Sequence, residues 1–387
     1  MPKKQLQNYL CYVIMVAENK PTGGNDMKML ILGDISPTGV NAHLFREQNL
    51  EALFGNTLPI FENKDFIFAN LECALTESDH AIPKFGPNLK APAETAQVLA
   101  TLGVSCVGLS NNHIFDFGIE GYQDTVAALH KAGVGYTGFG ENYEDSRKTM
   151  VIEHGGQKIA LITVCEHEYS YALEDRMGSR PFDEFDTPLD VREAKKTCDK
   201  VIVIYHGGKE MCQYPSPRLR KLCRTLIKSG ADLVVGQHSH CIGTYEEFEG
   251  GHILYGQGNT HFVWPDRDPL WNTGVAVVYD TVTGEIEFIS HKNTEVGITL
   301  VEGEEKEAIM AAFHDRESAC KDGRWKDGWH DFCVKNKENY RRVLANAFAP
   351  GSTQREDDNF GHYLDCEAHT DVWRELYPTY NLTNEKE

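Results

Sequence analysis

The feature that most constrains the fold is a repeating order of short apolar runs, polar loops and segments of helical spacing, which begins near Met27. Apolar runs rich in β-branched residues predict strands, and the helical segments between them predict an α/β fold. Strands are expected at residues 29–33, 66–71, 105–109, 159–164, 201–205, 233–235, 252–255 and 275–279. Helices are expected at residues 92–102, 118–131 and 216–229. The last two precede Gly133 and Gly230, because glycine favours the left-handed residue that ends a helix.

The chain divides into three predicted parts. Residues 1–27 form an N-terminal tail, and residues 28–295 hold the α/β domain, which ends in a hairpin around a Thr/Gly turn at residues 275–290. From residue 296 to residue 387 the pattern is acidic and mostly helical. Aromatic residues stand there among many charges, at Trp325, Trp329, Phe332 and Trp373. They predict an amphipathic extension that packs on the main domain.

The charge balance limits the partners. The chain has 38 basic and 58 acidic residues, so its formal net charge is −20. Proteins that bind nucleic acid usually carry a basic field, so we expect no nucleic-acid partner. A phosphorylated substrate remains compatible with the charge, because a bound divalent cation can reverse the field inside a cleft. The eleven cysteines include no CxxC pair and predict neither a disulfide framework nor a zinc ribbon.

The N-terminal segment bears on localisation. Lys3 and Lys4 precede an apolar stretch at residues 9–17, which faintly resembles a signal peptide. The stretch is short, contains two tyrosines and lacks a clear small-x-small cleavage site. No later run approaches the roughly 20 apolar residues of a spanning helix. We therefore expect no integral membrane segment and a cytoplasmic protein, with secretion as the less favoured alternative.

Polar residues able to bind metal ions follow the predicted strands, one loop after another. Such loops are where open α/β sheets place their sites. The residues are Asp34, Glu72, Asn111, Asn112, His113, His206, His238 and His240. Each alone has a plain structural explanation as a turn residue, a helix cap or a surface side chain. Together, nitrogen and oxygen ligands at five successive strand ends have no common structural purpose, so they predict a metal site.

The ligand types indicate which metals fit. Three histidines, one amide and two carboxylates suit Mn²⁺, Zn²⁺ or Fe²⁺, whereas Ca²⁺ and Mg²⁺ prefer nearly all oxygen. Six ligands exceed the needs of one tetrahedral ion. They suit two ions that share a carboxylate and keep open positions for water and substrate. We therefore expect two divalent metal ions as cofactors.

The motifs occur in a specific order along residues 27–280. They are Gly33-Asp34, Asn70-Leu71-Glu72, Asn111-Asn112-His113 with Asp116 and Gly118, His206-x-Gly208-x-Glu210, Gly236-x-His238-x-His240 and Tyr255-Gly256-x-Gly258-Asn259. This order resembles the CapA family of capsule and poly-γ-glutamate synthesis proteins. That family in turn resembles the calcineurin-like metallophosphoesterases. The resemblance implies a four-layer α/β/β/α sandwich with a binuclear metal site, to which this chain adds a helical C-terminal extension.

The resemblance also implies metal-binding roles by position. Asp34 would hold the first ion with His240, and Glu72 would bridge the two ions. The further ligands of the second ion would be Asn112, His206 and His238. The wider superfamily has a histidine where this chain has Ser36 and an aspartate where it has Glu72. These departures leave the first ion short of a strong ligand.

The same resemblance implies a catalytic role for His113, which would face the substrate as a general acid. Asp116 would orient its ring. Lys209, Glu210 and Asn111 are expected to contact the substrate. The implied chemistry is hydrolysis of a phosphoester or amide in a small-molecule or polymer substrate by a water that the metals activate. The sequence sets no oligomeric state.

Two other functions compete with this hypothesis. One is a non-catalytic assembly or binding component of a polymer-synthesis complex, in which the metal site is structural. The presence of His113 with Asp116 favours catalysis, because a structural site needs no free imidazole beside it. The other is a nuclease of the same superfamily, which the net charge disfavours.

The remaining candidates are weaker. Glu210 and the segment Glu166-His167-Glu168 also follow strands. They either line the mouth of the cleft or, as the favoured alternative, are solvated loop charges. His362, Cys366 and His369 have ligand-like spacing, but no fourth ligand is apparent in the sequence, so a second metal site there is not predicted.

Overall fold

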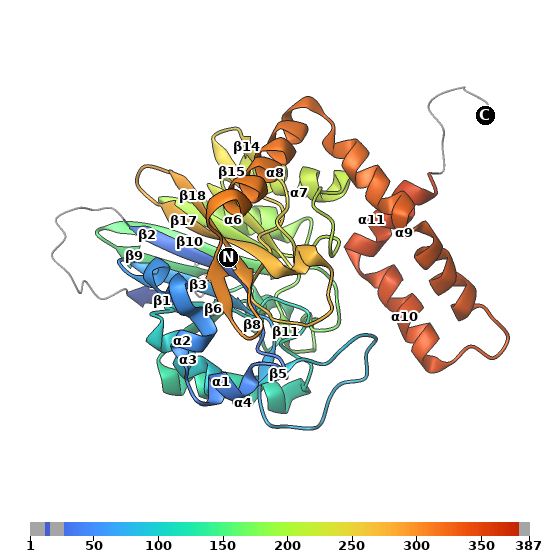
Figure 1. The fold of residues 1–387 in the computed structure, drawn as a ribbon, viewed down its shortest axis with the longest axis horizontal. Helices are drawn as coiled ribbons and strands as arrows, with labels where there is room; N and C mark the ends of the chain where they lie inside the picture. Colours follow the sequence, from blue (N-terminus) through green and yellow to red (C-terminus); the bar gives the residue numbers. More distant parts are fainter. Residues whose placement is uncertain (1–11, 16–26, 379–387) are drawn as a thin grey trace, which may run out of the picture.

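The computed structural model describes residues 12–15 and 27–378 (Figure 1). Two large sheets dominate this part of the chain. The first sheet has seven strands in the order β1, β9, β10, β12, β13, β15, β14. Their bounds are Tyr12–Met15, Met150–His154, Gln157–Cys165, Lys200–His206, Leu233–Gln237, Gly251–Leu254 and Tyr245–Phe248 in that order. Its central strands β10, β12, β13 and β15 run parallel.

The second sheet has eight strands. Seven follow the order β19, β18, β17, β2, β3, β6, β7, and β16 pairs with β2 beside this path. The bounds are Ile298–Leu300, Ile286–Asn293, Thr273–Asp280, Lys28–Ile35, Phe66–Leu71, Cys106–Gly108, Gly135–Thr137 and, for β16, Asn259–His261. Strands β2, β3, β6 and β7 are parallel, whereas β17 and β18 form the hairpin expected from the sequence.

Smaller elements lie between the strands of the two sheets. There are two short strand pairs. β4 (Ala74–Leu75) pairs with β5 (Lys90–Ala91), and β8 (Phe139–Gly140) pairs with β11 (Gly178–Ser179). The short helices are α1 (Ala42–Arg46), α2 (Leu50–Phe54) and α5 (Tyr143–Ser146), with 3-10 turns at Gly55–Phe61 and Pro269–Asn272. The longer helices of the main body are α3 (Thr95–Thr101), α4 (Gly118–Ala132), α6 (Asp186–Lys195) and α7 (Pro217–Ser229).

Alternating side chains divide the interior into three apolar layers. In β2, Met29 and Ile31 point into the core between the sheets, where they meet residues of the first sheet such as Leu161. Leu30 and Leu32 point the other way, into a core shared with α1 to α4. A third core lies between the first sheet and helices α6 and α7. The expected four-layer α/β/β/α sandwich is therefore confirmed.

The sequence located most of the core strands and missed several others. Strands β7, β9 and β14 were not expected, and β1 lies inside the predicted N-terminal tail, where it pairs with β9. Helix α3 begins at Thr95 and not at Pro92. All ten described cysteines are buried and free of disulfides. None of the helices in the described ranges combines the length and apolar character needed to cross a bilayer.

From Gly303 onward the C-terminal extension is helical, as expected, whereas residues 298–300 of the predicted extension form β19 in the second sheet. Its helices are α8 (Gly303–Asp322), α9 (Trp325–Ala347), α10 (Gln354–Asp365) and α11 (Glu367–Leu376). Helix α8 packs on the main body, because its Phe313 belongs to the core between the sheets. Helices α9, α10 and α11 gather at one side of the molecule (Figure 1). Buried aromatic residues hold them together, among them Trp329, Tyr340 and Tyr363.

Gly33 lies at a crowded point of the second sheet. An added Cβ atom there would lie 2.3 Å from the carbonyl oxygen of Gly258, a backbone atom that cannot move alone. We predict that Gly33→Ala destabilises the protein by about 1–3 kcal/mol through this overpacking. The matched control is Gly39→Ala, because no atom lies within 4 Å of its added Cβ. Urea unfolding of both variants checks the prediction, and equal midpoints would contradict it.

Candidate metal centre

The carboxyl ends of the parallel strands in both sheets meet at one edge, and the predicted ligands lie there. Asp34 is near the end of β2, Glu72 follows β3, and His206 ends β12. His238 and His240 follow β13, and Asn112 follows β6. All six side chains are buried. The structure thus brings together residues that are far apart in the sequence.

Asp34 lies between two histidines. Its Oδ1 atom is 3.6 Å from His206 Nδ1, and its Oδ2 atom is 3.5 Å from His240 Nδ1. Asn70 donates a hydrogen bond of 2.7 Å to Oδ1, which holds the carboxylate in place. Burial, and then the charge of Glu72, raises the pKa of Asp34 to about 6.

A second group of atoms converges on His206 Nε2. This nitrogen is 3.0 Å from Asn112 Oδ1, 3.2 Å from His238 Nδ1 and 3.4 Å from Glu72 Oε1. Glu72 Oε1 is also 3.8 Å from His240 Nε2. Glu72 therefore lies between both groups of ligands, as expected for a bridging carboxylate. The assignment of each residue to one ion remains a prediction.

The surroundings of the Glu72 carboxylate indicate that a metal ion fits between the candidate ligands. The side chain is fully buried, and neither of its oxygens has a hydrogen-bond partner among the described residues. Burial, with the charges of Glu210 and Glu168, raises its pKa well above the ordinary value. A buried carboxylate without a partner is costly, and a cation offsets that cost. Two sets of close ligand atoms share Glu72, one with His238 and His240 and one with Asp34 and His206.

The histidines are in a form suited to coordination. Burial lowers the pKa of His206, of His238 and of His240, the last to about 4, so the rings are neutral near pH 7. Asn259 Oδ1 is 2.8 Å from His240 Nδ1, which orients the ring and leaves Nε2 for a ligand bond. Strand pairing places Asn259 opposite Asp34.

The loop after β13 has an uncommon backbone. His238 and His240 have φ angles of 78° and 52°, in the left-handed region that non-glycine residues rarely adopt. The backbone nitrogen of His238 donates a 3.1 Å hydrogen bond to Asp34 Oδ2. This turn brings the rings of both histidines close to the Glu72 carboxylate. Such strain clusters at functional sites.

His113 lies beside the centre, and its ring contacts residues that are not among the six candidate ligands. Its Nδ1 atom is 2.7 Å from Asp116 Oδ2, and that carboxylate also accepts a hydrogen bond from the backbone nitrogen of Leu89. Lys84 contacts Asp116 Oδ1 and lies 3.1 Å from His113 Nδ1. Because Nδ1 cannot both donate to Asp116 and accept from Lys84, we assign its proton to the shorter contact with Asp116. His113 Nε2 then remains for other chemistry.

Asn111 corrects one expectation. It was expected to contact substrate, but its side chain is fully buried and both polar atoms are engaged inside the protein. The amide nitrogen donates to Asn70 Oδ1 and to the Leu71 carbonyl, and the amide oxygen accepts from the backbone of His113 and Ile114. Asn111 therefore shapes the loop that carries Asn112 and His113.

Lys209 and Glu210 are near enough to interact electrostatically with groups of the C-terminal helices and of the candidate centre, respectively. Burial would raise the pKa of Glu210, but Lys209, His238 and His240 lower it below the ordinary value. Burial would lower the pKa of Lys209, but Glu210 and groups of the C-terminal helices raise it. Their predicted contact with substrate remains a prediction.

Glu166 and Glu168 correct a second expectation, because both are buried and not solvated. Glu166 accepts hydrogen bonds from Tyr205 and Arg218. Glu168 Oε2 lies 3.6 Å from His238 Nε2, and its Oε1 atom contacts His362 of helix α10 at 2.7 Å. Glu168 thus joins the candidate metal centre to the C-terminal extension.

The family can be assigned from the motif-bearing region. A model of the bacterial capsule synthesis protein PGA_cap matches residues 28–263, which include all six predicted metal ligands. The chain belongs to the PGA_cap family. This PGA_cap chain is 27% identical over 256 residues to a capsule biosynthesis protein CapA of Bacillus anthracis and 28% identical over 240 residues to a PGA biosynthesis protein CapA of Bacillus subtilis (strain 168).

These relatives match part of each chain. The alignments cover 64% and 60% of this PGA_cap chain, and 62% of each relative. This chain thus spans less than two thirds of the relatives' length. Among solved structures, a hypothetical protein from Thermus thermophilus has a TM-score of 0.44 and 17% identity, and the match covers 69% of this chain and 100% of that one.

Sequence reasoning missed two residues of this PGA_cap site. Lys84 lies in the irregular segment between β4 and β5, where no periodic pattern marks a buried lysine. Asn259 was part of the family motif without an assigned role. The sequence signal for Asn259 was its position after two glycines at the start of a strand. Its role follows from the pairing of β16 with β2, which places Asn259 opposite Asp34.

The raised pKa of Asp34 predicts how metal binding depends on pH. A proton occupies this carboxyl below about pH 6 in the metal-free protein and must leave when a cation binds. His240 is neutral down to about pH 4 and adds no competing proton. We expect Mn²⁺ affinity to fall about tenfold from pH 7 to pH 5, because the ion must displace one proton that titrates near pH 6. Chelator competition at pH 5, 6 and 7 measures it.

The control for this experiment is Asp34→Asn. The variant should bind Mn²⁺ more weakly at every pH and with a shallower dependence below pH 6, because it has lost the titrating carboxyl. A wild-type affinity that is constant from pH 7 to pH 5 would contradict the prediction.

Proposed function

We propose that this PGA_cap protein is a metal-dependent hydrolase whose binuclear centre acts on a phosphoester or amide in capsule or poly-γ-glutamate polymer metabolism. The observation that carries the proposal is His113, an imidazole held by a buried carboxylate beside the ligand cluster and outside its coordinating set. A centre that only stabilised the fold would not require this second, separately oriented ring.

The metal-binding part of the proposal rests on six residues. Asp34, Glu72, Asn112, His206, His238 and His240 would hold two divalent ions, with Mn²⁺, Zn²⁺ or Fe²⁺ as the fitting metals. Bound there, such ions supply Lewis acidity and lower the pKa of water toward neutrality.

The protein's own residues supply orientation and proton transfer. Asp116 accepts a hydrogen bond from the Nδ1 proton of His113 and fixes the ring, so a doubly protonated His113 would pass its Nε2 proton to the leaving group and stay neutral with Nδ1 protonated. Lys84 contacts the other oxygen of Asp116 and holds that carboxylate in place. Asn70 and Asn259 orient Asp34 and His240. Lys209 supplies positive charge near the negative charge that develops during hydrolysis.

The polymer assignment rests on the family. The relatives in Bacillus carry names for capsule and PGA biosynthesis, and the matched region of this chain holds the metal-ligand motifs. Hydrolysis of a γ-glutamyl amide and hydrolysis of a phosphoester both develop negative charge on oxygen in the transition state, so one centre can serve either class. The net charge of −20 speaks against nucleic acid as the substrate.

Two histidine variants test the proposal. We expect His113→Ala to retain metal and to lose turnover by about 10²–10⁴-fold, the usual contribution of a general acid. His238→Ala should lose both metal and turnover. Metal content is measured by elemental analysis. Turnover is measured with p-nitrophenyl phosphate, bis-p-nitrophenyl phosphate and a γ-glutamyl anilide across Mn²⁺, Zn²⁺ and Fe²⁺.

The control is His130→Ala, which removes an exposed histidine of helix α4 away from the centre. It should match the wild type in both measurements. Loss of metal from His113→Ala would overturn the assigned roles. A wild type with bound metal and no turnover on any of these substrates would overturn the hydrolase and favour an assembly role.

A further inference from the structure

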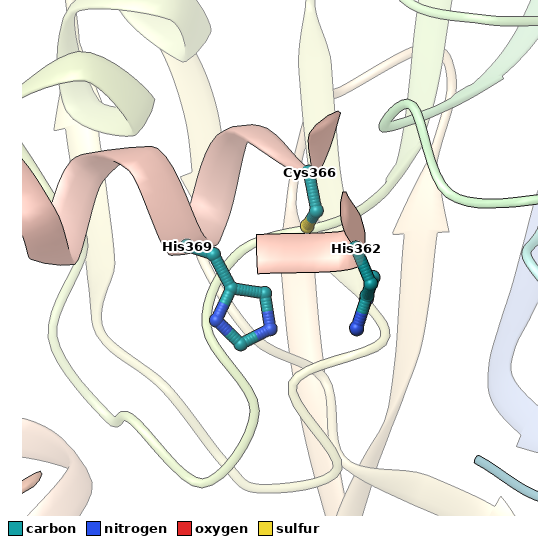
Figure 2. A group of neighbouring side chains, drawn as sticks. All are labelled: His362, Cys366 and His369. Carbon is teal, nitrogen blue, oxygen red and sulfur yellow. The ribbon is translucent and has the colours of Figure 1, made fainter. Parts of the chain in front are cut away.

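The α10–α11 junction carries a second cluster of metal-ligating side chains. His362 lies in α10, Cys366 is the junction residue, and His369 lies in the first turn of α11. One ligand atom from each residue lies within 4.8 Å of the others. Figure 2 shows the three side chains extending to the same side of the junction. The two imidazole rings are 4.8 Å apart at their centroids.

Each imidazole already has one nitrogen held by an outer partner. His362 Nε2 contacts Glu168 Oε1 at 2.7 Å, and His369 Nδ1 contacts the Tyr340 hydroxyl at 2.8 Å. Metal-bound histidines typically make such a contact, which fixes the tautomer and leaves the other nitrogen for the ion. The pairs Glu168–His362 and Tyr340–His369 therefore resemble the outer shell of a metal site.

Packing alone does not account for the cluster. His362 Nδ1 is buried and has no hydrogen-bond partner within the described part of the chain. Leaving such an atom without a partner costs free energy, which a ligand bond would offset. The nearby carboxylates also favour a cation, since Glu166 Oε2 lies 3.8 Å from Cys366 Sγ and Glu168 touches His362.

We propose that His362, Cys366 and His369 bind one further divalent ion, separate from the binuclear centre. Two imidazoles and a thiolate suit Zn²⁺, and three protein ligands leave a fourth tetrahedral position open. On binding, the Cys366 thiol releases its proton to solvent and its sulfur becomes the ligand.

The position of the site indicates what the ion would do. The junction already contacts the loop after β10 through His167 with Glu367 at 2.5 Å and Tyr171 with Asp365 at 3.0 Å. Glu168 reaches from this junction to His238 of the binuclear centre. An ion at the junction fixes the C-terminal helices against that loop and holds Glu168 in its place beside His238.

Cobalt substitution tests the proposal on the full-length chain. Cobalt bound by a thiolate gives a sulfur-to-metal charge-transfer band in the near ultraviolet, which oxygen and nitrogen ligands of the binuclear centre do not give. We expect the wild type to show this band and Cys366→Ser to lose both the band and one equivalent of cobalt. The control Cys333→Ser removes another buried cysteine of the same extension and should keep both.

A second variant keeps the test decisive if Cys366→Ser fails to fold. Tyr340→Phe removes the hydroxyl that positions His369 and should weaken cobalt binding at this site by about 10–100-fold, while the band returns at saturating cobalt. An unchanged cobalt affinity in Tyr340→Phe, a wild type without the band, or a band that survives Cys366→Ser overturns the proposal.

The test is independent of the proposed hydrolase. A band without turnover supports the junction site and counts against the hydrolase. Turnover without a band supports the hydrolase and contradicts the junction site, because metal at the binuclear centre then acts while the junction stays metal-free.

Discussion

The structure depends on the burial of two carboxylates, Asp34 and Glu72, among imidazoles at the edge where both sheets end. Burying an ionised carboxylate costs several kcal/mol unless partners offset it, and Glu72 has no hydrogen-bond partner within the described ranges. Neutral histidines cannot supply that charge. The fold therefore holds together groups that would otherwise be solvated, in an arrangement that fits a divalent cation.

The rigid frame for this arrangement comes from the contact between the sheets. Gln237 of β13 donates to the Leu32 carbonyl of β2 and to Gln257, and Gln257 donates to the Ile31 carbonyl. These hydrogen bonds of buried side-chain amides join the two sheets close to the strand ends that carry the candidate ligands. Apolar side chains fill the rest of the interface, so the carboxyl ends of both sheets stay in register.

The C-terminal extension packs against the main domain and contributes to its core. Its helix α8 contributes Phe313 to the core between the sheets, and Arg218 of α7 pairs with Asp371 of α11 at 2.9 Å. Glu168 is the single side chain between His362 of the extension and His238 of the candidate centre. The proposed hydrolase and the proposed junction site thus share one carboxylate and remain separable by their ligand chemistry.

The sequence alone determined most of the core strands and the types of the candidate ligands, because local apolar runs favour strands and because Asp34, Glu72 and the histidines stand at or just after the ends of these runs. It could not determine which polar side chains would be buried. Asn111 became a loop-holding residue, Glu168 became a buried link and Lys84 reached Asp116 from an irregular segment. Those outcomes depend on contacts between segments far apart in the chain, which local pattern does not encode, so only the tertiary structure decided them.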